Sequence, residues 1–387
     1  MRNNARTEKS VLNNWWWSVD RWTLAALMIL SLTGLVLVTA ASPAVAERIG
    51  LNPFHFVYRH IIMLVPALFI MVAVSMMGRK ALWRIASITL AGSAVLMIAA
   101  VFFGPEIKGA TRWIQIFGFS LQPSEFAKPA FAIASAWLIA RHHYQENFPG
   151  PQLATGLYIV IAGLLVLQPD FGMAVVLSAI WGAQIFLSGL PMLWVFVLAG
   201  VGISCIIGAY IFLPHVTSRI DRFLDPAAGD NYQVQKSLDA FANGGLFGTG
   251  PGHGQVKMNL PDAHADFIFA VAGEELGLLA ALGLVGLFFF IIGRSGWRAM
   301  SSNDLFVVLG VGGLLTQFAL QSLVHMGSSL QLLPAKGMTL PFISYGGSSL
   351  LSLGLGMGML LSLTRKRTQS NTKAVWQGFR RKADQYG

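Results

Sequence analysis

Long apolar runs separated by short polar segments make up most of this chain. We expect ten membrane-spanning helices, at residues 22–41, 57–77, 82–103, 124–140, 152–168, 172–189, 191–213, 266–293, 305–326 and 347–364. These runs are close to the ~20 apolar residues with which a helix crosses a bilayer. The pattern predicts an all-α polytopic membrane protein, with a short tail at 1–21, a transmembrane domain at 22–364 and a basic tail at 365–387.

The distribution of charge gives the expected orientation. An even number of spans places both termini on one side, and with cytoplasmic termini more than half of the 27 Lys and Arg residues fall in inner segments. Such an excess follows the positive-inside rule. The long connections 104–123 and 214–265 then lie outside, with the shorter connection 327–346, so we expect the function to face outward.

Composition excludes several classes of protein. The chain has 387 residues, of which 55% are hydrophobic and 11% charged, too apolar for an ordinary soluble domain. Its net charge of +10 comes from basic residues scattered among short loops, so we expect no nucleic-acid partner. The only cysteine, Cys205, lies in an apolar run, which leaves neither an intrachain disulfide nor a CxxC metal motif.

Ionisable side chains gather at the predicted outer ends of the spans. Glu125 and Lys128 are three residues apart on one helix face, and Asp170 follows the fifth span. We expect Asp170 to supply the counter-charge that a buried Lys128 requires. The three residues suit either a polar site or an ion cluster that only holds two helices together.

The eighth predicted span begins in the acidic segment LPDAHADFIFAVAGEELG, at 260–277. Helical geometry turns Asp266 half a turn away from Glu275 and places Glu274 about 12 Å deeper along the axis. Glu274 therefore suits a structural role. Asp266, at the mouth of the span, can reach a substrate from outside.

Several motifs, taken in order, resemble the SEDS family of membrane proteins, which includes FtsW, RodA and SpoVE. They are GATRWI at 109–114, QPSEFAK at 122–128, QPDFG at 168–172, NGGLFGTGPG at 243–252, LPDAHADFIFAVAGEELG at 260–277 and LLPAKGMTLPFISYGGSS at 332–349. The segments at 219–226 and 232–252 are more similar to members that act in cell division than to those that act in elongation. Two positions depart from the family pattern: Ala265, where many members carry Thr, and His325, where many carry Asn.

The resemblance implies a function and a set of partners. SEDS proteins polymerise lipid II into glycan strands on the outer face of the bacterial cytoplasmic membrane. The implied partners are lipid II, the growing glycan chain, a class B penicillin-binding protein transpeptidase, other division proteins at the septum and membrane lipids. The acid of the DFIF motif, here Asp266, is the proposed catalytic residue of the family.

Chain growth of this kind displaces polyprenyl pyrophosphate from an anomeric carbon, with a sugar 4-hydroxyl as the nucleophile. A carboxylate within hydrogen-bond reach can take the hydroxyl proton, and we assign this role to Asp266. One displacement would invert an α-linked donor into a β-1,4 product. The leaving group needs cations, for which the candidates are a divalent ion such as Mg²⁺ or Mn²⁺ and the side chains of Arg112, Lys128, Arg219, Arg222 and Lys257. The sequence neither ranks these side chains nor identifies metal ligands, and for each arginine a solvated loop charge is the favoured interpretation.

Other segments admit two interpretations each. The glycines within 244–254 could bring backbone amides to a phosphate or form a hinge. Ser344 and Ser348 could bind sugar or pyrophosphate, although Ser348 could instead cap the last span. His264 suits a polar loop position better than a metal site, which would need further ligands.

Two other classes of function use similar features. A transporter that flips lipid II outward would also have many spans and buried charges, and a scaffold that recruits division proteins is compatible with either activity. The charges favour an enzyme, because they gather at one face instead of the membrane midplane and no internal repeat is visible.

Overall fold

The computed structural model describes residues 11–106, 110–116, 118–145, 147–189, 232–334 and 337–366, with scattered residues between 191 and 223. Most of the seventh predicted span, 191–213, lies outside the described residues. The same is true of Cys205, Arg219 and Arg222, of residues 1–10 in the first predicted tail and of residues 367–387 in the second.

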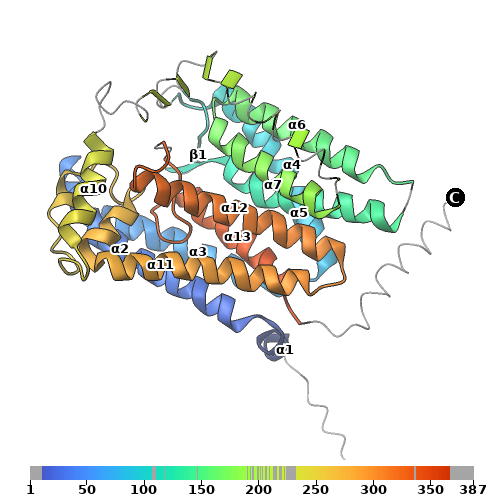
Figure 1. Cartoon of the computed structure of the whole chain (residues 1–387), viewed down its shortest axis with the longest axis horizontal. Coiled ribbons are helices and arrows are strands. Elements are labelled where there is room, and N and C mark those ends of the chain that lie inside the picture. The colour runs from blue at the N-terminus through green and yellow to red at the C-terminus, as the bar shows by residue number, and fades with distance from the viewer. Residues whose placement is uncertain are drawn as a thin grey trace, which may run out of the picture.

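Helices make up nearly all of the described chain (Figure 1). They are α1 (Val11–Ser18), α2 (Arg21–Arg48), α3 (His55–Ser75), α4 (Arg79–Phe103), α5 (Pro123–Tyr144), α6 (Gly150–Leu167), α7 (Phe171–Leu187), α10 (Tyr232–Gly244), α11 (Ile268–Met300), α12 (Leu305–Ser329) and α13 (Gly347–Leu363), with one 3₁₀ turn, η1 (Val256–Asn259). Six of these described helices, α2, α3, α4, α6, α11 and α12, are long and apolar enough to cross a membrane, and α7 and α13 are shorter apolar helices. The predicted helical, multi-pass architecture is confirmed at this level.

A short hairpin departs from the predicted all-α class. Strands β1 (Ile114–Ile116) and β2 (Phe119–Leu121) pair antiparallel within the connection before α5. The turn contains Gly118 with a φ of +78°, a conformation that glycine adopts without steric cost. Because β2 leads directly into α5, the hairpin lies over one end of the helix bundle.

The central helix of the bundle is α5. It packs against α4, α6, α12 and α13, and most of its residues as far as Ala140 are buried, including Glu125 and Lys128. Neighbouring helices, and not lipid, surround most of this helix, so it can carry charges and many alanines that allow close packing. The first turn of α5 therefore places charged side chains inside the bundle.

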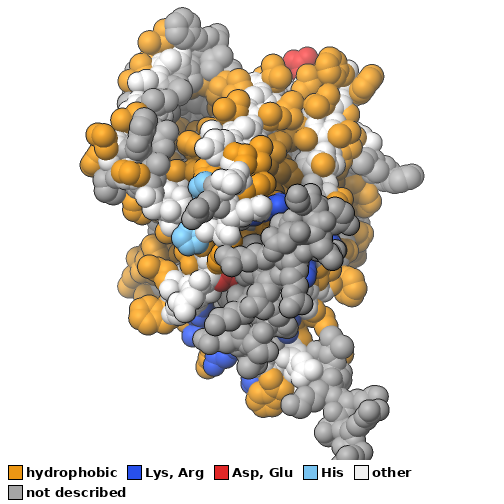
Figure 2. Space-filling view, turned by 90° about the vertical axis from the view of Figure 1, so that its right-hand side faces the viewer, with side chains coloured by type: hydrophobic (Ala, Val, Ile, Leu, Met, Phe, Trp, Pro, Cys, Tyr) orange, Lys and Arg blue, Asp and Glu red, His pale blue; other side chains and the backbone are white. Residues whose placement is uncertain are grey.

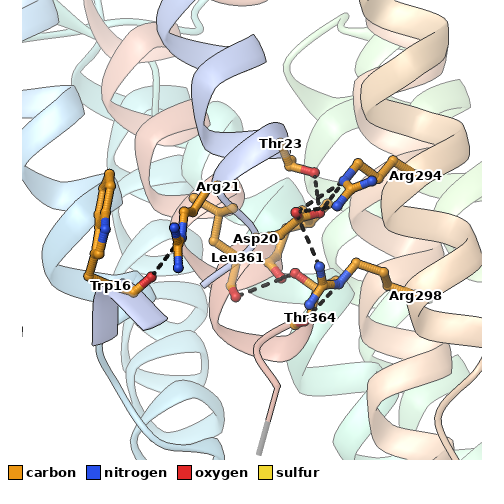
Figure 3. Close-up of polar contacts among 9 residues, drawn as sticks. Trp16, Asp20, Arg21, Thr23, Arg294, Arg298, Leu361 and Thr364 are labelled. Carbon is orange, nitrogen blue, oxygen red and sulfur yellow. Dashed lines mark hydrogen bonds and ion pairs between the residues drawn. The ribbon is translucent and has the colours of Figure 1, made fainter. Parts of the chain in front are cut away.

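Both ends of the described chain meet at the end of the bundle opposite the hairpin. The backbone N–H of Lys366 donates to the carbonyl of Ser18 at 3.0 Å. Asp20 accepts hydrogen bonds from Arg294 at 2.7 to 3.0 Å and pairs with Arg298 at 3.1 Å, as Figure 3 shows. Figure 2 views the molecule from the right-hand side of Figure 1, where Lys and Arg side chains are visible among hydrophobic ones. The meeting of the two ends agrees with an even number of spans.

The long helix α11 is interrupted at Gly277, where φ is +80° and ψ is 175°. Asp266 precedes the first helical residue, Ile268, and lies in a turn. The predicted continuous helix from 266 to 293 is therefore wrong, and with it the half-turn relation between Asp266 and Glu275. The hydropathy pattern did not mark the break, because Gly277 lies between Leu276 and Leu278 and the apolar run continues after it.

The backbone groups freed by this break bind the loop after α10. Carbonyl oxygens at the end of the first half of α11 accept from this loop, and amides at the start of the second half donate to it. The bonds are Thr249 N to Glu274 O at 2.9 Å, Gly250 N to Glu275 O at 3.0 Å and Leu278 N to Gly245 O at 2.9 Å.

Candidate functional site

A cavity of about 1070 Å³ lies at the hairpin end of the bundle. Its lining comes from α3, the hairpin, α5, α7, α10, α12 and the loops that precede α11 and α13. The volume is at the upper end of the range for small-molecule sites. Five of the predicted site residues line it: Arg112, Glu125, Asp170, Asp266 and Ser348.

Asp266 meets the backbone of a second loop, the one between α12 and α13. Its own N–H donates to the carbonyl of Asp262 at 3.0 Å, which fixes the turn before α11. Gly337 faces the carboxylate so closely that a Cβ atom there would lie 3.2 Å from Asp266 Oδ2. The φ of Gly337 is +61°, which glycine tolerates better than any other residue. Because Gly337 has no side chain, the carboxylate of Asp266 has space at this position.

The side chain of His264 is packed among aromatic rings. Its ring centroid lies 3.9 Å from that of Phe56 and 5.2 Å from that of Tyr345, and its carbonyl accepts the N–H of Tyr345 at 3.0 Å. Burial lowers the pKa of His264 to about 4, so the ring is neutral at pH 7. Within the described part of the chain, no three His, Cys, Asp or Glu residues form a group that could hold a metal ion. His264 orders the loop beside Asp266.

The acids at the other wall of the cavity form two separate ion pairs. Asp170 lies 3.6 Å from Arg112 Nη1 and accepts a hydrogen bond from Gln122 at 3.2 Å. Lys128 Nζ lies 2.9 Å from Glu125 Oε2, and both side chains are almost fully buried. The expected pairing of Lys128 with Asp170 is therefore wrong. Arg112 reaches Asp170 from the connection before the hairpin, which the span pattern could not place.

Glu274 and Glu275 serve the fold away from this cavity. Glu274 accepts hydrogen bonds from the side chain of Asn243 at 2.9 Å and from the backbone amides of Val256 and Lys257 at 2.8 and 2.9 Å. The ammonium of Lys257 pairs with Glu275. The structural role predicted for Glu274 is confirmed, while Lys257 does not line the cavity and is not available to a ligand there.

The glycines of the loop after α10 allow close packing on α11. A Cβ atom at Gly244 would lie 2.0 Å from the carbonyl oxygen of Gly273, and one at Gly248 would lie 2.2 Å from that of Glu275. Such distances are far inside van der Waals contact. Close approach to α11 accounts for Gly244 and Gly248, whereas Gly245 and Gly252 have no atom within 4 Å of the Cβ position.

The serines at the start of α13 have different roles. Ser344 Oγ accepts the N–H of Leu340 at 2.7 Å and so closes a turn. The N-cap of α13 is Gly346, without a side-chain hydrogen bond, so Ser348 does not cap the helix. Ser348 lines the cavity.

Three lining residues carried little signal in the sequence. Arg59 lies at the start of α3, where its Nη2 donates to the carbonyl of Gly118 at 3.0 Å. A single arginine beside an apolar run usually marks a membrane boundary. Gln122 and Thr339 also line the cavity, and neutral side chains of this kind are recognised only from their neighbours in space.

Comparisons with known proteins agree on one family. The FTSW_RODA_SPOVE family model, described as cell cycle protein, matches residues 20–369. The chain is 42% identical to the probable peptidoglycan glycosyltransferase FtsW of Caulobacter vibrioides, over 94% of this chain and 93% of that protein. It is 38% identical to the protein of the same name from Coxiella burnetii, over 90% and 96% of the two chains.

Solved structures are similar over almost the whole chain. A chain from "Structural coordination of polymerization and crosslinking by a peptidoglycan synthase complex" matches with a TM-score of 0.73 and 26% identity, over 90% of this chain and 98% of that one. The rod shape determining protein RodA of Thermus thermophilus matches with a TM-score of 0.64 and 26% identity, over 91% and 99% of the two chains.

Proposed function

The chain belongs to the FtsW, RodA and SpoVE family of cell cycle proteins, the SEDS family, and we propose that it is a peptidoglycan glycosyltransferase of cell division. The substrate is lipid II, and the reaction adds its disaccharide to a growing β-1,4 glycan strand with release of undecaprenyl pyrophosphate. Its place is the outer face of the bacterial cytoplasmic membrane at the septum.

The observation that carries this proposal is the position of Asp266 at the wall of a large cavity. The carboxylate lies beside the backbone of Gly337, at 3.2 Å from the point where a Cβ atom would be. In the proposed reaction Asp266 takes the proton of the attacking 4-hydroxyl while the anomeric carbon loses its pyrophosphate. The proton moves to the carboxylate as the new glycosidic bond forms, and the configuration inverts.

Two arginines are the best candidates for the pyrophosphate. Arg59 and Arg112 both line the cavity and are half-buried. Arg112 also pairs with Asp170 and donates to the carbonyl oxygens of Gln168 and Pro169, so Arg59 has more donors left for an anion. Lys128 and Lys257 are buried in ion pairs with Glu125 and Glu275. The lining acids Glu125 and Asp170 are each engaged by a cation, Lys128 and Arg112, so the described lining does not fit a divalent ion such as Mg²⁺ or Mn²⁺.

The opposite end of the bundle favours an enzyme over a flippase. There Asp20 joins α2 to α11 through Arg294 and Arg298, and Arg79 of α4 pairs with Asp304 before α12. A transporter needs access from both sides in turn. Ion pairs that tie the helices together at this end fit a protein that works at one face.

A transpeptidase is the partner that we infer for this chain. The similar chain with a TM-score of 0.73 comes from a peptidoglycan synthase complex described in terms of polymerisation and crosslinking. We propose that a class B penicillin-binding protein binds this chain and cross-links its product.

Reconstitution tests the proposed activity. The protein is purified with its transpeptidase, supplied with lipid II in detergent, and the product is separated on a gel. We expect a ladder of glycan polymer. If lipid II moves across vesicle membranes and no polymer forms, the result would instead favour the transporter.

A further inference from the structure

Three side chains of α12 hold the loop that faces Asp266. Gln321, His325 and Ser328 are spaced by four and three residues, which places them on one face of the helix. Their partners in the loop are, in turn, Thr339, Met338 and Pro334, although Ser328 Oγ also donates to Val324 O within α12 at the shorter distance of 2.7 Å. The loop is therefore fastened to a membrane helix close to the candidate base.

The contact made by His325 is the shortest of the three. Its Nδ1 lies 2.6 Å from the carbonyl oxygen of Met338, whereas the contacts of Gln321 and Ser328 measure 3.4 and 3.2 Å. A carbonyl oxygen only accepts, so Nδ1 is the donor. His325 is 1% exposed, and Nε2 has no hydrogen-bond partner among the described residues. The ring thus holds the loop through one atom.

Met338 directly follows Gly337, whose backbone faces the carboxylate of Asp266. The route from His325 to Asp266 consists of one hydrogen bond, one peptide unit and the face of Gly337 on which a Cβ atom would lie 3.2 Å from Asp266 Oδ2. Without the hydrogen bond, the carbonyl of Met338 is free to turn, and Gly337 moves with it. A displacement of about 1 Å at a reacting group can lower a rate about 100-fold.

We propose that His325 is a positioning residue that holds Gly337 and Met338 in place and thereby orients Asp266 toward the attacking hydroxyl. This inference rests on the proposed glycosyltransferase function. His325 acts through the loop, and its buried ring also lines the cavity. Asn has its amide nitrogen on Cγ, as His has Nδ1. Both residues can therefore offer a donor at the same point.

The test compares His325→Asn, His325→Gln and His325→Leu in lipid II polymerisation by the complex with the transpeptidase. Asn keeps a donor on Cγ, Gln moves it one bond outward, and Leu removes it. We expect kcat of the Asn variant to stay within about threefold of wild type, and kcat of the Gln and Leu variants to fall about 10- to 100-fold with little change in KM.

Ser322→Ala is the matched control on the same helix. Ser322 is buried, and its hydroxyl donates to Phe318 at 2.7 Å within α12, not to the loop. We expect this variant to keep the wild-type rate. Thermal unfolding of every variant is measured in parallel, because a purely structural role would lower stability and activity together.

The comparison of the His325→Asn and His325→Gln variants tests the positioning role of His325 even if the His325→Leu variant fails to fold. Equal kcat values for the Asn and Gln variants would overturn the positioning role, as would wild-type kcat in a folded Leu variant. A wild-type protein that makes no polymer would remove the proposed function, and this inference with it.

Discussion

Gly337 is a single residue on which the geometry around Asp266 depends. An alanine there would place its Cβ 3.2 Å from Asp266 Oδ2 and keep a φ of +61°, at about 1 kcal/mol of strain. We expect Gly337→Ala to lower kcat about 10-fold or more. Gly50→Ala is the control, because Gly50 has a φ of +71° and no atom near its Cβ position. Equal polymerisation rates for the two variants would contradict the assigned contact.

The buried pair of Glu125 and Lys128 leads to a second prediction at this scale. Lys128→Met leaves the carboxylate without its cation, and we expect a loss of about 3–5 kcal/mol in stability. Adding Glu125→Gln should recover part of that loss. Adding Asp170→Asn should not, because Asp170 pairs with Arg112, and separate pairs behave additively. Thermal unfolding of the single and double variants in detergent checks this. Recovery of stability with Asp170→Asn, and none with Glu125→Gln, would instead support the pairing of Lys128 with Asp170.

Residue-level prediction from the sequence was right about which side chains share one helix face and wrong about the partner of Lys128. Glu125 and Lys128 are three residues apart, and they form the ion pair that this spacing permits. The partner of Asp170 depends on how a connection folds over the bundle, and Arg112 lies in such a connection. No periodicity in the sequence specifies that contact.

Helix α11 and the loop after α10 form one unit at the scale of elements. Gly277 has a φ of +80°, and a Cβ there would lie 2.4 Å from the amide nitrogen of Gly248. We expect Gly277→Ala to destabilise the protein by more than the ~1 kcal/mol of backbone strain alone. Hydrogen exchange at the amides of Thr249 and Gly250, which bind α11, should become faster.

A matched change in the same helix provides the control. Gly283 has no atom within 4 Å of its Cβ position, and Gly to Ala in a helix interior is favourable by about 1 kcal/mol. Gly283→Ala should leave exchange in the loop unchanged. If both variants gave the same exchange rates, the loop would not depend on the break in α11.

Apolar runs predicted most helices but not their ends. Span one was expected to end at residue 41, whereas α2 continues to Arg48 and passes Pro43. Span eight was expected to end at 293, and α11 continues to Met300. Beyond the apolar layer, helix ends depend on local contacts, so hydropathy carries no signal for them. The hairpin was missed because its strands are only three residues each.

At the scale of the whole molecule, the orientation in the membrane is open to a direct test. Gln255 and Gln145 are both exposed. Gln255 directly precedes η1, and Gln145 follows the last residue of α5, at the end of that helix away from the hairpin. In a Cys205→Ser background, we expect Gln255→Cys to react with an impermeant maleimide in intact spheroplasts. Gln145→Cys should react only after lysis, because the positive-inside rule places it in the cytoplasm. Labelling of the Gln145 variant alone in intact cells would invert the topology and place the cavity on the wrong side for lipid II polymerisation.

The measurement that tests the central claim most directly compares two neighbouring aspartates. Asp266 lines the cavity and Asp262 does not, while Asn can adopt the φ of +50° found at Asp262. We expect Asp266→Asn to lower polymerisation of lipid II about 10²- to 10⁴-fold, because an amide cannot accept the hydroxyl proton. Asp262→Asn should retain activity close to wild type. Wild-type polymerisation by a folded Asp266→Asn protein would contradict the account.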